Sequence, residues 1–100
     1  MRQRRVIYTP DATTDLEWIY DTIATARSPL VASRYEQRIR DFCQRLEYGA
    51  ERGTSRADIR PGLQVVGFER RVTVAIVAED DRVVILRIFY GGRDWANDFP

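Results

Sequence analysis

The chain has 100 residues, of which 44% are hydrophobic and 31% are charged, and its net charge at pH 7 is +1. This length predicts one domain, residues 1–100, with enough apolar material for a core. A charge so close to neutral does not fit a dedicated nucleic-acid-binding domain, so no direct sequence-specific binding of nucleic acid is expected.

The residue types that are missing exclude several kinds of chemistry. The sequence contains no histidine, which is the commonest general acid or base near neutral pH and the commonest metal ligand. Zinc sites, Ser-His-Asp triads and Cys-His dyads are therefore excluded, and no metal or cofactor is expected. A single cysteine allows no internal disulfide. With no apolar run long enough for a membrane span or a signal peptide, the sequence predicts a cytoplasmic protein.

Residues 4–8 have the pattern of a short strand, and a helix begins directly after them. Thr9 supplies an N-cap oxygen, and Pro10 occupies the first helical position, where its missing N–H costs nothing. Apolar residues then recur at helical spacing, which predicts a helix with one buried face that ends near Ala26.

Ser28 and Pro29 repeat this start signal and predict a second helix, with Gly49 as its C-terminal stop. Cys43 lies on the apolar stripe of this helix, so it is interpreted as a small core residue and not as a nucleophile. Because only two or three residues join the two helices, they must run antiparallel as a helical hairpin.

Residues 50–62 are polar and rich in turn formers, which predicts a loop. Three strands are predicted after it, at 63–68, 72–78 and 83–90, and the joins between them are short enough for β-hairpins. The resulting order, β-α-α-β-β-β, predicts an α+β fold of two layers, in which the helical hairpin packs on a mainly antiparallel sheet.

A set of short motifs runs through the whole chain in a fixed order. The motifs are Tyr8-Thr9-Pro10-x-Ala12, Asp15-Leu16-x-x-Ile19-Tyr20, Ser28-Pro29-x-x-Ala32, Arg52-Gly53-Thr54, Asp58-Ile59-Arg60-Pro61-Gly62-Leu63, Ile85-Leu86-Arg87-Ile88 and Gly91-Gly92-Arg93-Asp94. Together they resemble the RelE/ParE superfamily, the toxins of bacterial type II toxin–antitoxin pairs. The resemblance implies two possible activities. RelE-like toxins cut messenger RNA on the ribosome, and ParE-like toxins poison DNA gyrase without cutting anything themselves.

The residues favour the ParE-like branch. Cleavage of RNA needs groups that accept and give a proton, and cations for the developing charge on phosphorus. By the resemblance, a RelE-like enzyme would have a basic residue at Gln64, an arginine at Arg93 and a titratable residue at Phe99. Two of these three positions carry side chains that cannot exchange a proton. Tyr90 could replace the missing acid. A structural role, as an aromatic residue that closes the end of the sheet, is the simpler interpretation of Tyr90.

Arg87 interrupts an otherwise apolar strand, which makes it a candidate for binding. Strand alternation places it on the same face as Ile85 and Phe89. A charged side chain in such a strand needs a partner or water. Two interpretations are open: an ion pair, with Asp58 or Asp94, or a contact on the helix-free face of the sheet.

Four further residues are candidates for contacts with a protein partner. Arg60 lies in the loop that leads into the second strand, where it contacts a partner or fixes the loop. Arg93, Asp94 and Trp95 lie in the C-terminal tail, and an arginine beside a tryptophan is a typical anchor of a protein interface. The alternative for these three is a tail that packs back onto the sheet.

The leading hypothesis is a ParE-like toxin with no catalytic residues of its own. By the resemblance, its partners are DNA gyrase and a ParD-like antitoxin. The C-terminal segment of this antitoxin would wrap the helical hairpin and reach the sheet, giving a hetero-oligomer. The rival hypothesis is a RelE-like ribosome-dependent endoribonuclease that uses Arg60, Arg87, Arg93 and Tyr90. A third is a degenerate member that binds only its antitoxin.

Overall fold

The computed structural model describes residues 3–91, and of Glu51 only the backbone. The chain forms two long helices, one short helix, one 3-10 turn and five strands within these residues. In order they are β1 (Arg5–Tyr8), α1 (Pro10–Ala26), α2 (Pro29–Gln44), α3 (Leu46–Gly49), η1 (Ala50–Arg52), β2 (Thr54–Ser55), β3 (Leu63–Phe68), β4 (Val72–Ala78) and β5 (Arg82–Tyr90). None of the helices in this part of the chain is both long enough and apolar enough to cross a membrane.

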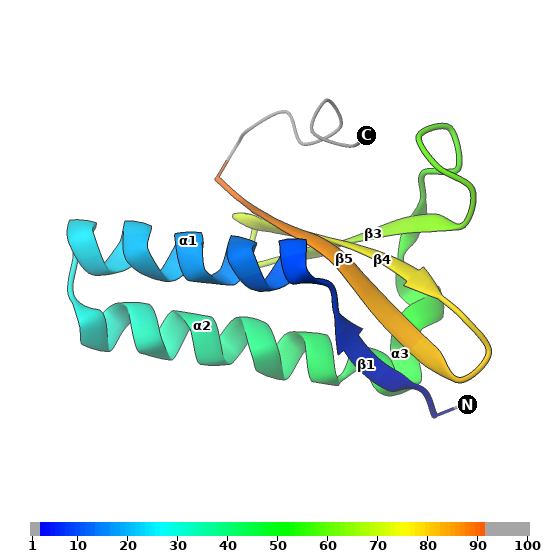
Figure 1. Cartoon of the computed structure of the whole chain (residues 1–100), viewed down its shortest axis with the longest axis horizontal. Helices are drawn as coiled ribbons and strands as arrows, with labels where there is room; N and C mark the ends of the chain where they lie inside the picture. Colours follow the sequence, from blue (N-terminus) through cyan, green and yellow to red (C-terminus); the bar gives the residue numbers. More distant parts are fainter. Residues whose placement is uncertain (1–2, 92–100) are drawn as a thin grey trace.

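The strands form one sheet in the order β1-β5-β4-β3-β2. The first strand pairs with the last in parallel, and the other neighbours are antiparallel. Helices α1 and α2 form an antiparallel hairpin against the sheet, and the turn between them projects beyond the ends of the strands (Figure 1). The predicted two-layer α+β fold is therefore confirmed.

Both helices of the hairpin begin at the predicted caps. The hydroxyl of Thr9 accepts a hydrogen bond from the backbone N–H of Ala12 at 3.0 Å, and that of Ser28 accepts from the N–H of Val31 at 3.2 Å. Each cap is followed by a proline in the first turn of its helix. The caps satisfy N–H groups that have no partner inside the helix, so they fix where each helix starts.

The main core lies between the hairpin and the sheet. The apolar stripes of α1 and α2 pack against every second side chain of β4 and against one side of β5. The buried members of this cluster are Ala12, Leu16, Ile19, Ile23, Ala32, Ile39, Cys43, Leu46, Ala50, Val72, Val74, Ile76, Val83, Ile85 and Ile88. A smaller cluster on the other side of the sheet contains Leu63, Ala75 and Phe89. The loop residue Ile59 packs against this second cluster.

The segment between the hairpin and β3 differs from the prediction. The second helix ends at Gln44 and not at Gly49, although Arg45 keeps a helical backbone and a new short helix, α3, follows at once. This break lets Leu46 and Ala50 point into the core, where they are almost fully buried. The predicted loop 50–62 also contains the 3-10 turn η1 and the two-residue strand β2, which pairs with β3.

Cys43 is fully buried beside Tyr8, as the helical pattern predicts. Burial raises the pKa of the Cys43 thiol to about 11, although the hydrogen bond with Tyr8 acts in the opposite direction. The reactive thiolate is therefore scarce at neutral pH, and reagents cannot reach the sulfur in the folded chain.

We expect the folded chain to react with a disulfide reagent such as DTNB much more slowly than a free thiol at pH 8. In urea above the unfolding transition, one thiol per chain should react at the rate of an exposed cysteine. Absorbance of the released thionitrobenzoate measures both rates. Fast stoichiometric labelling of the folded chain would contradict this placement of Cys43.

The hydroxyl of Thr9 also donates a hydrogen bond to the carbonyl of Leu86 in β5 at 2.8 Å. The variant Thr9→Ala loses this bond together with the cap, so its free energy of unfolding should fall by about 2 kcal/mol. The control Thr9→Ser keeps the oxygen and should lose much less. Urea unfolding followed by circular dichroism distinguishes the two variants, and equal losses would show that the hydroxyl is unimportant.

Candidate functional site

The start of α1 replaces a strand along one edge of β5. Pairing between β1 and β5 ends at Tyr8 and Ile85, and β5 continues for five more residues. Beyond that point, Thr9 donates its backbone N–H to the carbonyl of Ile85 at 3.1 Å. Further along, the backbone N–H of Ile88 donates to a carboxylate oxygen of Asp15 at 2.8 Å. Together with the Thr9 hydroxyl, these groups hydrogen-bond the β5 edge where no strand covers it.

The same stretch of β5 contains a β-bulge. Ala75 and Ile76 are adjacent in β4, but their partners in β5 are Arg87 and Ile85, so Leu86 is the extra residue. The bulge changes the alternation of the strand. As a result Ile85 and Ile88 both belong to the helix-facing cluster. The prediction that Arg87 shares a face with Ile85 was therefore wrong.

Arg87 is held by Asp15 of α1. Its Nε and one terminal nitrogen donate to the two carboxylate oxygens at 2.8 and 3.0 Å. The side chains are only 20% and 14% exposed, so the pair is largely shielded from water. The guanidinium carbon also lies 4.8 Å from the centre of the Phe89 ring. The result is a fixed cation at the edge of the sheet.

The expected ion pair of Arg87 exists, with Asp15, an acid that the sequence analysis did not suggest as its partner. The carboxylate of Asp58 binds Arg56 instead, with two bonds of 3.0 Å. Asp94, the other suggested partner, lies outside the described residues. In the sequence, Asp15 was singled out only as part of the motif Asp15-Leu16-x-x-Ile19-Tyr20. Nothing in the sequence links it to a residue 72 positions away.

Arg60 is exposed in the turn before β3. Its backbone N–H donates to the carbonyl of Arg56, and its carbonyl accepts from the N–H of Leu63 at 3.1 Å. Gly62 has φ of +79°, a conformation that favours glycine, so the direction of this turn is fixed. Within the described part of the chain, the guanidinium of Arg60 forms no ion pair and points outward as an available cation.

The candidates Arg93, Asp94 and Trp95 lie outside the described residues. The last described residue is Gly91, with φ of +85°, whose N–H donates to the carbonyl of Arg71 at 2.8 Å. Of the five predicted binding residues, the structure therefore places two, Arg60 and Arg87. They lie on different elements and are not brought into contact, so a shared binding role stays a prediction.

The positions that a nuclease would use are separated along the sheet. Gln64 pairs with Ile76, and Tyr90 pairs with Val72. These partners are four residues apart in β4, which corresponds to about 13 Å. The rings of Tyr90 and Tyr35 meet edge to face, with centroids 5.9 Å apart.

Gln64 is also turned towards the interior. By its place in the alternation of β3 it shares a side with Val66, which packs on the helix-facing core. Its Oε1 is buried, and within residues 3–91 it has no hydrogen-bond partner. A Cβ added to Gly53 would come within 2.8 Å of this oxygen, so the side chain is covered by the segment before β2.

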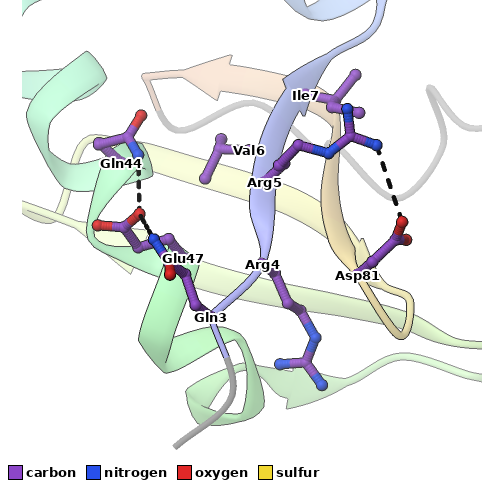
Figure 2. Close-up of a pocket in the computed structure, with 8 residues that line it drawn as sticks. All are labelled: Gln3, Arg4, Arg5, Val6, Ile7, Gln44, Glu47 and Asp81. Carbon is purple, nitrogen blue, oxygen red and sulfur yellow. Dashed lines mark hydrogen bonds and ion pairs between the residues drawn. The ribbon is translucent and has the colours of Figure 1, made fainter.

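A recess of about 660 Å³ lies beside β1 and is lined mainly by polar and charged residues. Figure 2 shows Glu47 hydrogen-bonded to both Gln3 and Gln44, and Arg5 facing Asp81. The last two side chains are about three-quarters exposed, so this ion pair contributes little to stability. No group of three or more acids or cysteines among residues 3–91 is placed to hold a metal ion.

Comparisons with known proteins agree on one family. The family model described as the ParE toxin of the type II toxin–antitoxin system parDE matches residues 6–95. A solved structure described as the chromosomal ParDE toxin–antitoxin system from P. aeruginosa superposes with a TM-score of 0.78 at 25% sequence identity. The match covers 90% of this chain and 98% of the other. No curated protein matches significantly.

The geometry of the Asp15–Arg87 pair predicts that Asp15 contributes strongly to the free energy of unfolding. In Asp15→Ala, a shielded guanidinium loses its carboxylate and the N–H of Ile88 loses its acceptor. The free energy of unfolding should fall by about 3 kcal/mol or more. Asp15→Asn keeps an acceptor for Ile88 and should lose less.

Asp58→Ala is the matched control, because it removes the carboxylate of an exposed arginine pair. Its unfolding curve in urea should be close to that of the unmodified chain. If Asp15→Ala and Asp58→Ala shift the midpoint equally, the Asp15–Arg87 pair does not have the role described above.

Proposed function

Because this chain belongs to the ParE toxin family of type II toxin–antitoxin systems, we propose that it inhibits DNA gyrase by binding and that a ParD-like antitoxin neutralises it. The toxin supplies no acid or base in this proposal. It acts through its surface, and it forms a hetero-oligomer with the antitoxin.

The observation that carries the proposal is the separation of Gln64 from Tyr90. A nuclease must bring its proton-handling groups and cations around one scissile phosphate, within hydrogen-bond reach of it. Here an amide that cannot titrate is covered by a loop, and Tyr90, the residue that could replace the acid, packs against Tyr35 about 13 Å away along β4. Since the sequence has no histidine, no residue of that type can replace them.

Charged side chains are better placed for recognition than for catalysis. Arg60 projects from a turn whose backbone is fixed, and Arg87 is anchored at the edge of β5. The sequence continues from β5 into Arg93, Asp94 and Trp95. Anchored arginines beside aromatic residues are typical of the few positions that contribute most of the affinity of a protein interface. We assign these five residues to contacts with gyrase or with the antitoxin.

The decisive experiment measures supercoiling by purified gyrase with and without the purified toxin. We expect the toxin to inhibit supercoiling and to increase cleaved DNA. Expression without the antitoxin should produce DNA breaks and filamentous cells, while messenger RNA stays intact. The variant Tyr90→Phe keeps the ring against Tyr35 and should remain fully active, because no hydroxyl chemistry is required.

Transcripts cut at codons in the presence of ribosomes, together with inactivity of Tyr90→Phe, would instead show a RelE-like endoribonuclease. A chain that binds its antitoxin but causes neither DNA breaks nor RNA cleavage would be an inert member that only regulates.

A further inference from the structure

Charged side chains are distributed unequally between the two long helices. Helix α1 contains acidic residues and no basic one, and its Asp11, Glu17 and Asp21 are exposed. Arginines occur instead on α2 and directly after it, where Arg34 and Arg45 are exposed. The net charge of +1 therefore results from surfaces of opposite sign and does not describe the surface of α2.

Five exposed arginines form one basic surface along α2 and the turn between β3 and β4. We call it the arginine ridge, and its members are Arg34, Arg38, Arg45, Arg70 and Arg71. The first three are spaced by four and seven residues, so they share one side of the helix and span about 16 Å of its length. The turn is fixed to this side, because Arg38 donates two hydrogen bonds to the carboxylate of Glu69.

Two arginines of the ridge lie over a cluster of aromatic rings. The ring of Phe68 packs against those of Tyr35 and Phe42, with centroids 6.5 and 4.9 Å apart. The guanidinium carbon of Arg38 lies 4.8 Å from the centre of the Tyr35 ring, and that of Arg45 lies 5.9 Å from the centre of the Phe42 ring. A ring positions a guanidinium without neutralising it. The rings are half-buried, so the ridge presents charge and not the apolar centre that protein interfaces usually have.

Most of the charge on the ridge is not neutralised. Of its five members, only Arg38 pairs with a carboxylate within residues 3–91. Asp41 lies on the same side of α2, but its carboxylate accepts a hydrogen bond from the amide of Gln37. The arginines of the ridge thus outnumber Asp41 and Glu69, the two acids that line the same recess of about 180 Å³.

The turn that contains Arg70 has a strained backbone. Glu69 and Arg70 have φ of 51° and 66°, in the left-handed region that favours glycine. Two-residue hairpin turns of this kind usually contain Asn-Gly or Asp-Gly. Glu69 is bonded to Arg38, whereas the side chain of Arg70 forms no ion pair in the part of the chain that the structure describes. Packing therefore does not explain an arginine at this position, and strain of this kind is concentrated at functional sites.

We propose that the arginine ridge binds phosphate groups of the DNA duplex that gyrase holds, without reading its sequence. A guanidinium donates two parallel hydrogen bonds to a phosphate, and a duplex presents one negative charge per about 1.7 Å of its axis. An elongated row of arginines fits such a row of charges. The acidic surface of α1 is repelled by the same duplex and so helps to orient the toxin. The proposal rests on the proposed function, which brings the toxin to DNA.

The test measures the affinity of fluorescently labelled toxin for purified gyrase, with and without a bound DNA duplex, by anisotropy at two salt concentrations. At low salt the unmodified toxin should bind the gyrase–DNA complex about tenfold more tightly than gyrase alone, and this gain should shrink as salt is added. The double variant Arg34→Gln, Arg45→Gln removes two charges at exposed helical positions, where glutamine is also a good helix former. It should keep its affinity for gyrase alone and lose most of the gain.

Arg70→Gly removes a charge and relieves strain at the same position. Its melting temperature should rise, while the gain from DNA should fall about threefold, a combination that a purely structural role would not produce. Arg70→Lys keeps the charge and should keep most of the gain. Arg5→Gln is the matched control, because it removes an arginine from β1 whose side chain is 73% exposed outside the ridge. Its affinities should equal those of the unmodified chain.

The outcomes separate the two proposals. If the toxin binds and inhibits gyrase but DNA adds no affinity, or if the ridge variants keep the gain, the ridge proposal is wrong and the toxin assignment stands. If the ridge variants lose affinity for gyrase alone, the ridge contacts protein, and our assignment to DNA is overturned. If the unmodified toxin binds gyrase neither with nor without DNA, both proposals fail.

Discussion

The fold depends on two polar side chains at the start of α1 that hydrogen-bond the edge of β5. Beyond Ile85 this strand has no neighbour on one side, although its backbone lies against a helix and away from bulk water. The Thr9 hydroxyl bonds the carbonyl of Leu86, and the Asp15 carboxylate bonds the N–H of Ile88. A buried backbone group without a partner costs about 1–3 kcal/mol. These two bonds therefore allow β5 to extend past β1 and to bulge without leaving its polar groups unsatisfied.

The same arrangement fixes the position of one charged side chain. The bulge at Leu86 changes which side chains of β5 face the helices, and the Asp15 carboxylate then holds Arg87 at the sheet edge. A change at Asp15 would therefore affect both the hydrogen bonding of the β5 edge and the position of Arg87.

Local chemistry explains which features the sequence could predict. The Thr9-Pro10 and Ser28-Pro29 caps act within a few residues, so the helix starts were predicted correctly. The positions of β1, β3, β4 and β5 were also predicted, whereas the short strand β2 was missed. The bulge at Leu86 and the partner of Arg87 depend on contacts between residues far apart in sequence, and strict alternation could not reveal them. The end of α2 was misplaced for a similar reason, because burial of Leu46 in the tertiary core outweighs the stop signal at Gly49.

The helical hairpin buries an apolar stripe along the sheet and exposes other apolar side chains near its turn. Near its base the stripe is buried, since Leu16 and Ile19 are only 1% exposed. Near its turn the sheet has ended, and Val31 and Leu30 remain in water. Ile23 and Ala32, close to the same turn, are still buried, so the core extends almost to the end of the hairpin. Exposed apolar side chains directly beside the core are typical of surfaces that a partner covers.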